Sequence, residues 1–441
     1  MALSRAQAAH LMRRVCLGGG TDAEIDHFTG RSRASAVNEV INDALTAPAP
    51  PHPDWTGLPN PWAEETATIG WWIDQMNYSS GPLREKMAWF WHGHFCTEED
   101  KIFDMDLMFD QNTLFRSQGL GNFRNLVQAV SIQPAMLIYL DNETNQKGAE
   151  QENFARELME LFTVGRENYT ESDVVAMAKA WTGHNSVGWV QAGNGSWQYV
   201  PDYTFKPEYH DNTQKTLFGK TRNWNGPGTI NEICNGARKV ECSEFIAGKL
   251  WRFFAHPNPS NALVQSLGSH FRSSGLNIAE LMRHILMHDD FWAAGSRYAL
   301  VKSPVEFLAT ILKRTGAEMD ANGRRWYLQG MGQVPFDPPD VAGWGDNEDW
   351  LSTATAWGRA LAVKHTRWQL DDLGHLQNLE EAGGNVVANR VFELLGITEP
   401  TAQTRQVIRD WVAAVQESRH VWSITPQAYV LAALSPDFQL N

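Results

Sequence analysis

The sequence predicts a mainly α-helical fold, in which residues 1–441 form one large multi-helix domain and residues 183–228 form a small β-hairpin and long-loop insertion within it. Helix start signals recur along the chain, as in the capping box of Thr21 and Glu24. Strand-type alternation is confined to short pieces such as SWQYV at 196–200. A hydrophobic share of 43% is sufficient for a sizeable core.

Proline and N-cap signals mark the helix starts in order along the chain. Ser32 is an N-cap candidate, Pro82 and Pro134 occupy N1 positions, and Ser303 stands three residues before Glu306. We therefore expect helices at residues 32–45, 83–92, 135–140, 241–255, 276–288, 351–371 and 401–417, with one more opening at 304. The Pro-rich stretch 47–61 reads as an extended connection.

The segment 183–228 differs from the helical remainder, because it is rich in Gly, Asn, Trp and Tyr. Loops of this length in a compact protein are usually functional or disordered, and the aromatic content argues against disorder. We expect a small hairpin whose tryptophans, Trp189 among them, form one wall of a cleft.

Charge and composition exclude several functions. The net charge of −14 argues against a nucleic-acid partner, and no apolar run approaches the roughly 20 residues that a membrane span needs. Arg13-Arg14 is not followed by an apolar stretch, so the sequence as it stands predicts a cytoplasmic protein; export stays open if a leader was removed. The four cysteines form no C-x-x-C pair. Gly18–Gly20 lacks the preceding strand of a dinucleotide fold.

The most informative stretch is 153–165, where four polar side chains share one face of a predicted helix. They are Asn153, Arg156, Glu157 and Glu160, and the opposite face is apolar. One interpretation is a solvated face with ion pairs along it. The other is an inward-facing cluster that binds a metal or holds an acid and a base at different pKa values. Periodicity alone does not separate the two.

Several longer motifs occur along the chain. They are LREKMAWFWHGHF (83–95), PAMLIYLD (134–141), NFARELMELFTVG (153–165), YTESDV (169–174), AWTG (180–183), HDNTQKTLFG (210–219), KSPVEF (302–307) and GQVPFDPPDVAGW (332–344). Together they resemble the bacterial domain-of-unknown-function family 1800. The resemblance implies a largely helical protein without an established activity, often exported, and often found beside a sulfatase-like family that would supply a partner. His184 departs from the family pattern, which tends to have tryptophan after TG.

His92 and His94 are the first candidate metal ligands. In a helix that continued through both, they would point about 160° apart, but Gly93 could end the helix at His92 and turn His94 back. The resemblance favours this reading, since W-H-x-H-F is typical of the family. The alternative is that His94 is a hydrogen-bonded core histidine.

His210 is the third candidate ligand, and Asp211 beside it would be an orienting or catalytic carboxylate. Their alternative is a simple turn. Glu157 and Glu160 are the carboxylates expected to complete a site for a divalent metal ion such as zinc, manganese or iron. Arg156 would neutralise Glu160 or clamp an anionic substrate group.

Three functions remain open from the sequence. The first is a metal-dependent hydrolase or oxidoreductase acting on a small molecule or glycan, because tryptophan faces suit sugar rings. Its substrate-binding residues would be Asn153, Trp181, His184, Trp189 and Trp344. The second is metal-free carboxylate catalysis on a glycosidic bond. The third is a non-enzymatic binding or assembly protein.

Overall fold

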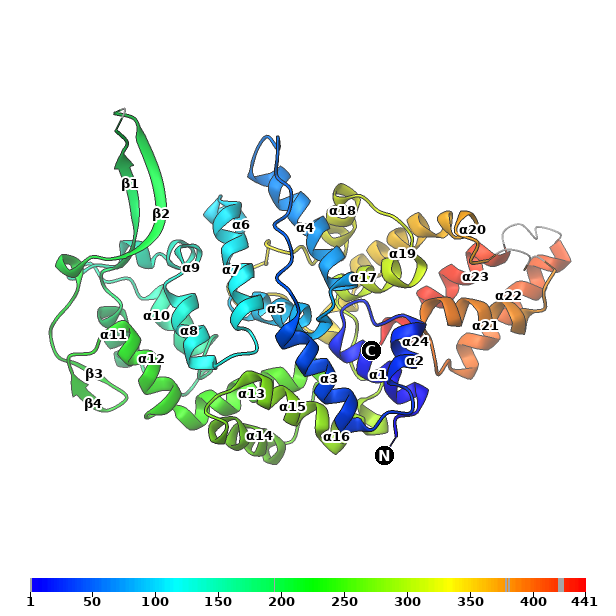
Figure 1. Ribbon diagram of the computed structural model, residues 1–441, viewed down its shortest axis with the longest axis horizontal. Helices are drawn as coiled ribbons and strands as arrows, with labels where there is room; N and C mark the ends of the chain where they lie inside the picture. Colours follow the sequence, from blue (N-terminus) through cyan, green and yellow to red (C-terminus); the bar gives the residue numbers. More distant parts are fainter. Residues whose placement is uncertain (1, 194, 377–378, 380, 419–423) are drawn as a thin grey trace.

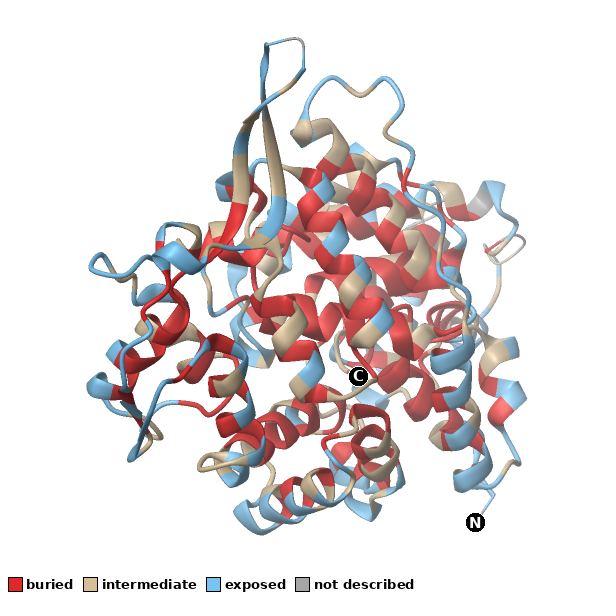
Figure 2. Cartoon of the chain, turned by 60° about the vertical axis from the view of Figure 1, so that its left-hand side comes forward, coloured by how far each residue is buried: buried red, intermediate tan, exposed pale blue. Residues whose placement is uncertain are grey.

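The computed structural model describes residues 2–193, 195–376, 379, 381–418 and 424–441. As predicted, the chain forms a mainly α-helical single domain, and its described strands pair into two small two-stranded sheets. In Figure 1 the helices extend along a horizontal axis, with hairpin β1–β2 projecting at the left and α21 and α22 at the right. Buried residues fill the middle of the helical body, whereas the outer part of the hairpin is exposed (Figure 2).

The first half of the chain contributes helices α1 to α11. Their bounds are α1 Arg5–Val15, α2 Asp22–Phe28, α3 Arg33–Thr46, α4 Pro61–Tyr78, α5 Pro82–His94, α6 Glu99–Ile102, α7 Met105–Gln118, α8 Phe123–Ser131, α9 Pro134–Tyr139, α10 Asn153–Glu160 and α11 Glu171–Ala180. The predicted starts at Ser32, Pro82 and Pro134 are confirmed. The Pro-rich connection is also confirmed, since no helix or strand occurs between Ala47 and Asn60.

The second half is helical after the insertion. The bounds are α12 Gly226–Asn235, α13 Lys239–Phe254, α14 Asn261–Ser273, α15 Ile278–Met287, α16 Asp289–Trp292, α17 Pro304–Thr315, α18 Ala321–Met331, α19 Thr353–Arg367, α20 Gln369–Asp372, α21 Gly384–Leu395, α22 Ala402–Ser418, α23 Ile424–Ala433 and α24 Pro436–Gln439. Both side-chain bonds of the capping box predicted at Ser303 and Glu306 are present. The single helix expected at 351–371 is divided between α19 and α20.

The insertion has the predicted β content. Strands β1 (His184–Gln191) and β2 (Trp197–Phe205) form an antiparallel hairpin, and β3 (Lys215–Leu217) pairs with β4 (Lys220–Arg222). The register of the first hairpin shifts between Ser186 and Gly188, which marks a β-bulge. The β3–β4 pair lies beside α11 in Figure 1.

Helix α5 lies at the centre of the body and is buried on all sides. Every residue of α5 except Pro82 and Gly93 is buried, including five charged or potentially charged side chains near its start and end. Glu85 accepts a 2.8 Å bond from Arg116 of α7, and Lys86 donates a 2.6 Å bond to Glu306 of α17. Because an unpaired buried charge is costly, these pairs determine which helices surround α5.

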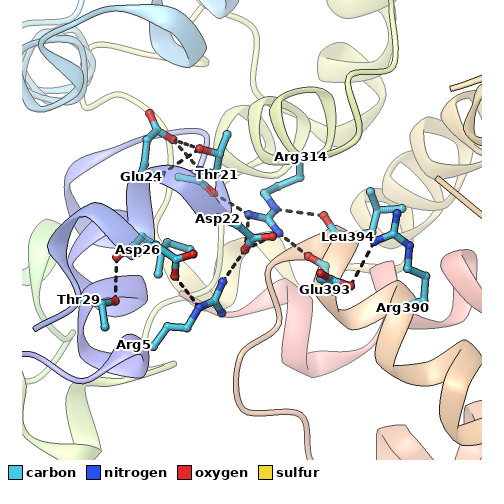
Figure 3. Close-up of polar contacts among 12 residues, drawn as sticks. Arg5, Thr21, Asp22, Glu24, Asp26, Thr29, Arg314, Arg390, Glu393 and Leu394 are labelled. Atoms are coloured by element: carbon cyan, nitrogen blue, oxygen red, sulfur yellow. Dashed lines mark hydrogen bonds and ion pairs between the residues drawn. The ribbon is translucent and has the colours of Figure 1, made fainter. Parts of the chain in front are cut away.

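A second polar junction ties the N-terminal helices to α17 and α21 (Figure 3). Arg314 of α17 donates to the carbonyls of Glu393 and Leu394 in the last turn of α21, and to Gly20 O at 3.2 Å and Asp22 at 3.3 Å. The Arg314 side chain is only 5% exposed. It therefore caps one helix and fixes a second one with the same guanidinium group.

Replacing Arg314 should destabilise the fold strongly. Arg314→Ala leaves several carbonyl oxygens without donors at a nearly buried position, so the free energy of unfolding should fall by about 3 kcal/mol. Arg5→Ala is the matched control, because Arg5 also pairs with Asp22 but is 45% exposed, and it should cost at most about 1 kcal/mol. Urea unfolding of both variants checks this; similar losses would contradict the assigned role of Arg314.

Candidate functional site

A pocket of about 420 Å³ lies between α5, the end of α10, α13 and the loop 332–346. Its lining combines aromatic rings with charged groups of both signs. The lining residues are Trp89, Phe90, Gly93, His94, Glu160, Leu161, Gly165, Arg166, Phe245, Lys249, Arg252, Phe253, Gln333, Ala342, Trp344, Gly345 and Asp346. A concave, largely apolar site with a few converging polar groups is the usual form of a small-molecule site.

One wall of the pocket is aromatic. The indoles of Trp89 and Trp344 stack with ring centroids 5.3 Å apart. The loop that carries Trp344 approaches α5 closely at Gly343, whose φ is +86° and where a Cβ would lie 2.5 Å from Gly93 O. Only glycine fits that position, so the backbone itself holds Trp344 against α5.

His94 and Lys249 form a polar pair on the pocket wall. His94 Nε2 donates to Phe162 O at 3.0 Å, and Lys249 Nζ donates to His94 Nδ1 at 3.1 Å. Burial lowers the pKa of His94 well below its usual value, and the Lys249 charge lowers it further. Burial also lowers the pKa of Lys249. A neutral His94 thus holds the Lys249 amine in place.

Two carboxyl groups in the lining have pKa values displaced in opposite directions. Glu160 accepts hydrogen bonds from the hydroxyl of Tyr169 and from Arg166 Nε, the latter at 2.6 Å, and these lower its pKa. Asp346, an exposed residue, also lines the pocket; nearby protein atoms raise its pKa, and the positive charge of Lys249 opposes this effect. Pairs of this kind are characteristic of acid–base sites.

The predicted histidine ligands are not brought together. Helix α5 continues through His94, so the expectation that Gly93 ends it at His92 is wrong. His92 Nε2 accepts a 3.0 Å bond from Phe336 N, and burial lowers its pKa to about 3. Both nitrogens of His94 are already engaged. His210 lies in the insertion, with its Nδ1 2.8 Å from Thr182 O.

The polar face of α10 divides between the pocket and the surface. Glu160 lines the pocket, whereas Arg156 pairs with Glu171 at 2.7 Å outside it. Asn153 donates a 3.0 Å bond to Asp141. Glu157 is half-buried and its pKa is raised, chiefly by burial. Arg156 therefore matches the solvated interpretation and Glu160 the inward-facing one.

Among the candidate substrate-binding residues, Trp344 lines the pocket, whereas Asn153, Trp181, His184 and Trp189 do not. Trp181 is buried and donates a 3.1 Å bond to Thr229. His184 Nδ1 lies 3.0 Å from the Tyr203 hydroxyl, and Trp189 is 67% exposed on the hairpin. Asp211 accepts bonds from the amide and hydroxyl of Thr213, both at 2.6 Å, as in an Asx turn.

Carboxylates, rather than histidines, make the group suited to a metal ion. In the described part of the chain, ligand oxygens of Glu98, Asp100 and Asp337 lie within 4.8 Å of one another. Burial and mutual repulsion raise the pKa values of Glu98 and Asp337. An all-oxygen set suits Mg²⁺, Ca²⁺ or Mn²⁺. The run Glu98–Asp100 was the sequence signal for this group, but Asp337 joins it only through the fold.

The neighbouring Glu65 should make stability depend on pH. Burial raises its pKa from 4.5 to about 7 despite a 2.9 Å pair with Arg325. A carboxyl group whose pKa is higher in the folded protein binds more protons in the folded state than in the unfolded state. Its contribution to the free energy of unfolding is therefore complete below pH 4.5 and is lost as the pH rises through about 7.

Glu65→Gln should reduce the difference in the free energy of unfolding between low and high pH by up to about 3 kcal/mol. Urea unfolding at pH 4.5 and pH 8 measures it, with the neighbouring Glu64→Gln as a control that keeps the wild-type difference. If the wild type and Glu65→Gln change equally between the two pH values, Glu65 is not the group responsible.

Comparisons with known proteins agree with the sequence motifs. No helix in the described residues is long and apolar enough to cross a membrane. No curated protein and no solved structure matches the chain. The family model described as "Protein of unknown function (DUF1800)" matches residues 10–440, which is nearly the whole chain. The chain therefore belongs to the DUF1800 family.

Proposed function

We propose that the pocket beside α5 is the active site of an enzyme that uses Glu160 and Asp346 in acid–base catalysis. The observation that carries this proposal is that both carboxyl groups line one pocket while their pKa values are displaced in opposite directions. Glu160 would act in its ionised form as base or nucleophile, and Asp346 in its protonated form as acid. Hydrolysis of a glycosidic bond is the reaction that two such groups serve best.

The aromatic wall supports a ring-containing substrate. Trp344, half-buried and stacked on the buried Trp89, would offer an apolar face to a sugar ring, and polar groups of Gln333 and Lys249 lie in the same lining to bind hydroxyls. Arg252 adds positive charge to the lining. A glycan or glycoconjugate with an anionic substituent is therefore the favoured substrate class.

The proposal predicts the effect of removing each carboxyl group. Glu160→Gln and Asp346→Asn should each lower kcat by about 10²-fold to 10⁴-fold, with little change in Tm. The assay is the hydrolysis of a panel of p-nitrophenyl glycosides. Glu171→Gln, which removes an exposed carboxylate paired with Arg156, is the control and should keep the wild-type rate.

The pH profile gives a second readout in the same assay. The rate should rise as the pH passes the lowered pKa of Glu160 and fall as it passes the raised pKa of Asp346. Asp346→Asn should abolish the falling limb. Wild-type rates in both variants, or a panel that neither reacts nor changes tryptophan fluorescence, would contradict a glycosidase site and favour a binding or assembly role.

A metal-assisted enzyme is the second candidate, and the carboxylates of Glu98, Asp100 and Asp337 favour it. Asp337 belongs to the same loop 332–346 that carries Trp344, so a cation bound there would stabilise the position of one wall of the pocket. The cation would act through this loop, because none of the three carboxylates lines the pocket itself.

Binding of a hard cation should raise Tm. Titrating chelator-treated protein with MnCl₂ should give a saturable increase, which Asp337→Asn removes and His210→Gln retains. If His210→Gln instead loses the increase in Tm and Asp337→Asn keeps it, the metal binds at the histidines predicted from the sequence and not at the carboxylates.

A further inference from the structure

A group of buried cations lies where α1, the start of α17, α19 and the C-terminal residues meet. Arg13, Arg14, Lys302 and Arg359 are each no more than 6% exposed. Two buried carboxylates lie near them, Asp437 and Glu306, and Glu306 already accepts a 2.6 Å bond from a fifth cation, Lys86. Positive charge therefore exceeds negative charge inside the protein, an arrangement that costs free energy unless it is compensated.

Protein acceptors satisfy only part of this group. Lys302 Nζ donates to the carbonyls of Phe438 and Leu440 at 2.5 and 2.8 Å. In the described part of the chain, buried guanidinium nitrogens without a hydrogen-bond partner remain on the three arginines: Nε and Nη2 of Arg13, Nε and Nη1 of Arg14, and Nε of Arg359. Buried donors of this kind are rare and indicate a missing acceptor.

Two of these cations line a small cavity of about 20 Å³. Arg13 and Lys302 share its lining with Arg314 and with the backbone of Gly19 and Gly20. Both glycines have positive φ values, +70° and +80°, and among the described residues no acceptor takes a hydrogen bond from the amide of Gly20, a buried residue. The volume suits one water molecule or a monoatomic ion and is too small for phosphate or sulfate.

We infer that this cavity is a binding site for a monoatomic anion of the halide class. Arg13, Lys302 and Arg314 all line the cavity. Arg314 is paired with Asp22 at 3.3 Å, and the carboxylate of Asp437, which accepts bonds from Thr401 at 2.8 and 3.1 Å, also lies in the lining, so one positive charge there remains without a carboxylate. A halide accepts from several N–H groups at once and also offsets the excess charge, which water does not do.

The electrostatics of Lys302 agree with this inference. Burial, followed by the charge of Arg13, lowers the pKa of Lys302 well below its usual value. Burial also lowers the pKa of Arg14 to about 9. An anion in the cavity would oppose the lowering of the Lys302 pKa by charge attraction and would hold α1 to the C-terminal residues. The site is separate from the pocket beside α5 and does not depend on its function.

Bromide, which scatters X-rays anomalously, is the direct probe. Crystals of the full chain grown or soaked in NaBr should show an anomalous peak in the cavity between Arg13 and Lys302. Ordered density there without an anomalous signal means that water fills the cavity, and this result would overturn the inference.

Thermal melting provides the solution test. At equal ionic strength, Tm should be higher by about 2 °C or more in NaBr than in sodium gluconate, whose anion is too large for the cavity. Lys302→Met should lose this difference. Lys215→Met should keep it, because Lys215 is a buried lysine that donates to backbone carbonyls far from the cavity. Equal wild-type Tm values in the two salts would contradict the anion site. If Lys302→Met does not fold, the anomalous map of the wild-type protein still tests whether an anion occupies the cavity.

Discussion

The structure depends on burying the polar side chains of α5. This helix is enclosed on every side, so each charged or hydrogen-bonding group on it requires a partner from another element. Glu85 pairs with Arg116 of α7, and Lys86 pairs with Glu306 of α17. His92 accepts a hydrogen bond from the backbone amide of Phe336. These bonds fix the positions of segments that are up to 244 residues away in the sequence. Apolar packing alone would not specify which elements adjoin which face of the helix.

The pocket is a consequence of that arrangement. Because His94 holds Phe162 O on one side and Lys249 on the other, the end of α10 and the middle of α13 are set across from each other. His92 anchors the loop 332–346 through Phe336, which brings Trp344 against Trp89. The histidines that the sequence suggested as metal ligands thus position neighbouring elements around the candidate site. Their lowered pKa values agree with neutral, hydrogen-bonded imidazoles.

The helices and the β insertion could be predicted because their signals are local: capping residues, N1 prolines and composition lie within a few positions of what they specify. The candidate site could be predicted only in part. Glu160, His94 and Trp344 stood out within motifs, but Lys249 and Asp346 carry no local signal and meet the pocket only through tertiary packing. The α10 periodicity could not show that Arg156 would pair with Glu171 on the next helix while Glu160 turned inward.

The proposed chemistry depends on one pocket that holds two carboxyl groups whose pKa values are displaced in opposite directions. The most direct measurement is a ¹³C carboxyl titration of the labelled protein by NMR, with Glu160→Gln and Asp346→Asn used to assign the two signals. We expect Glu160 to titrate below its ordinary range and Asp346 above its own. Titration of both groups at ordinary values would contradict the acid–base assignment and leave the pocket without a catalytic pair.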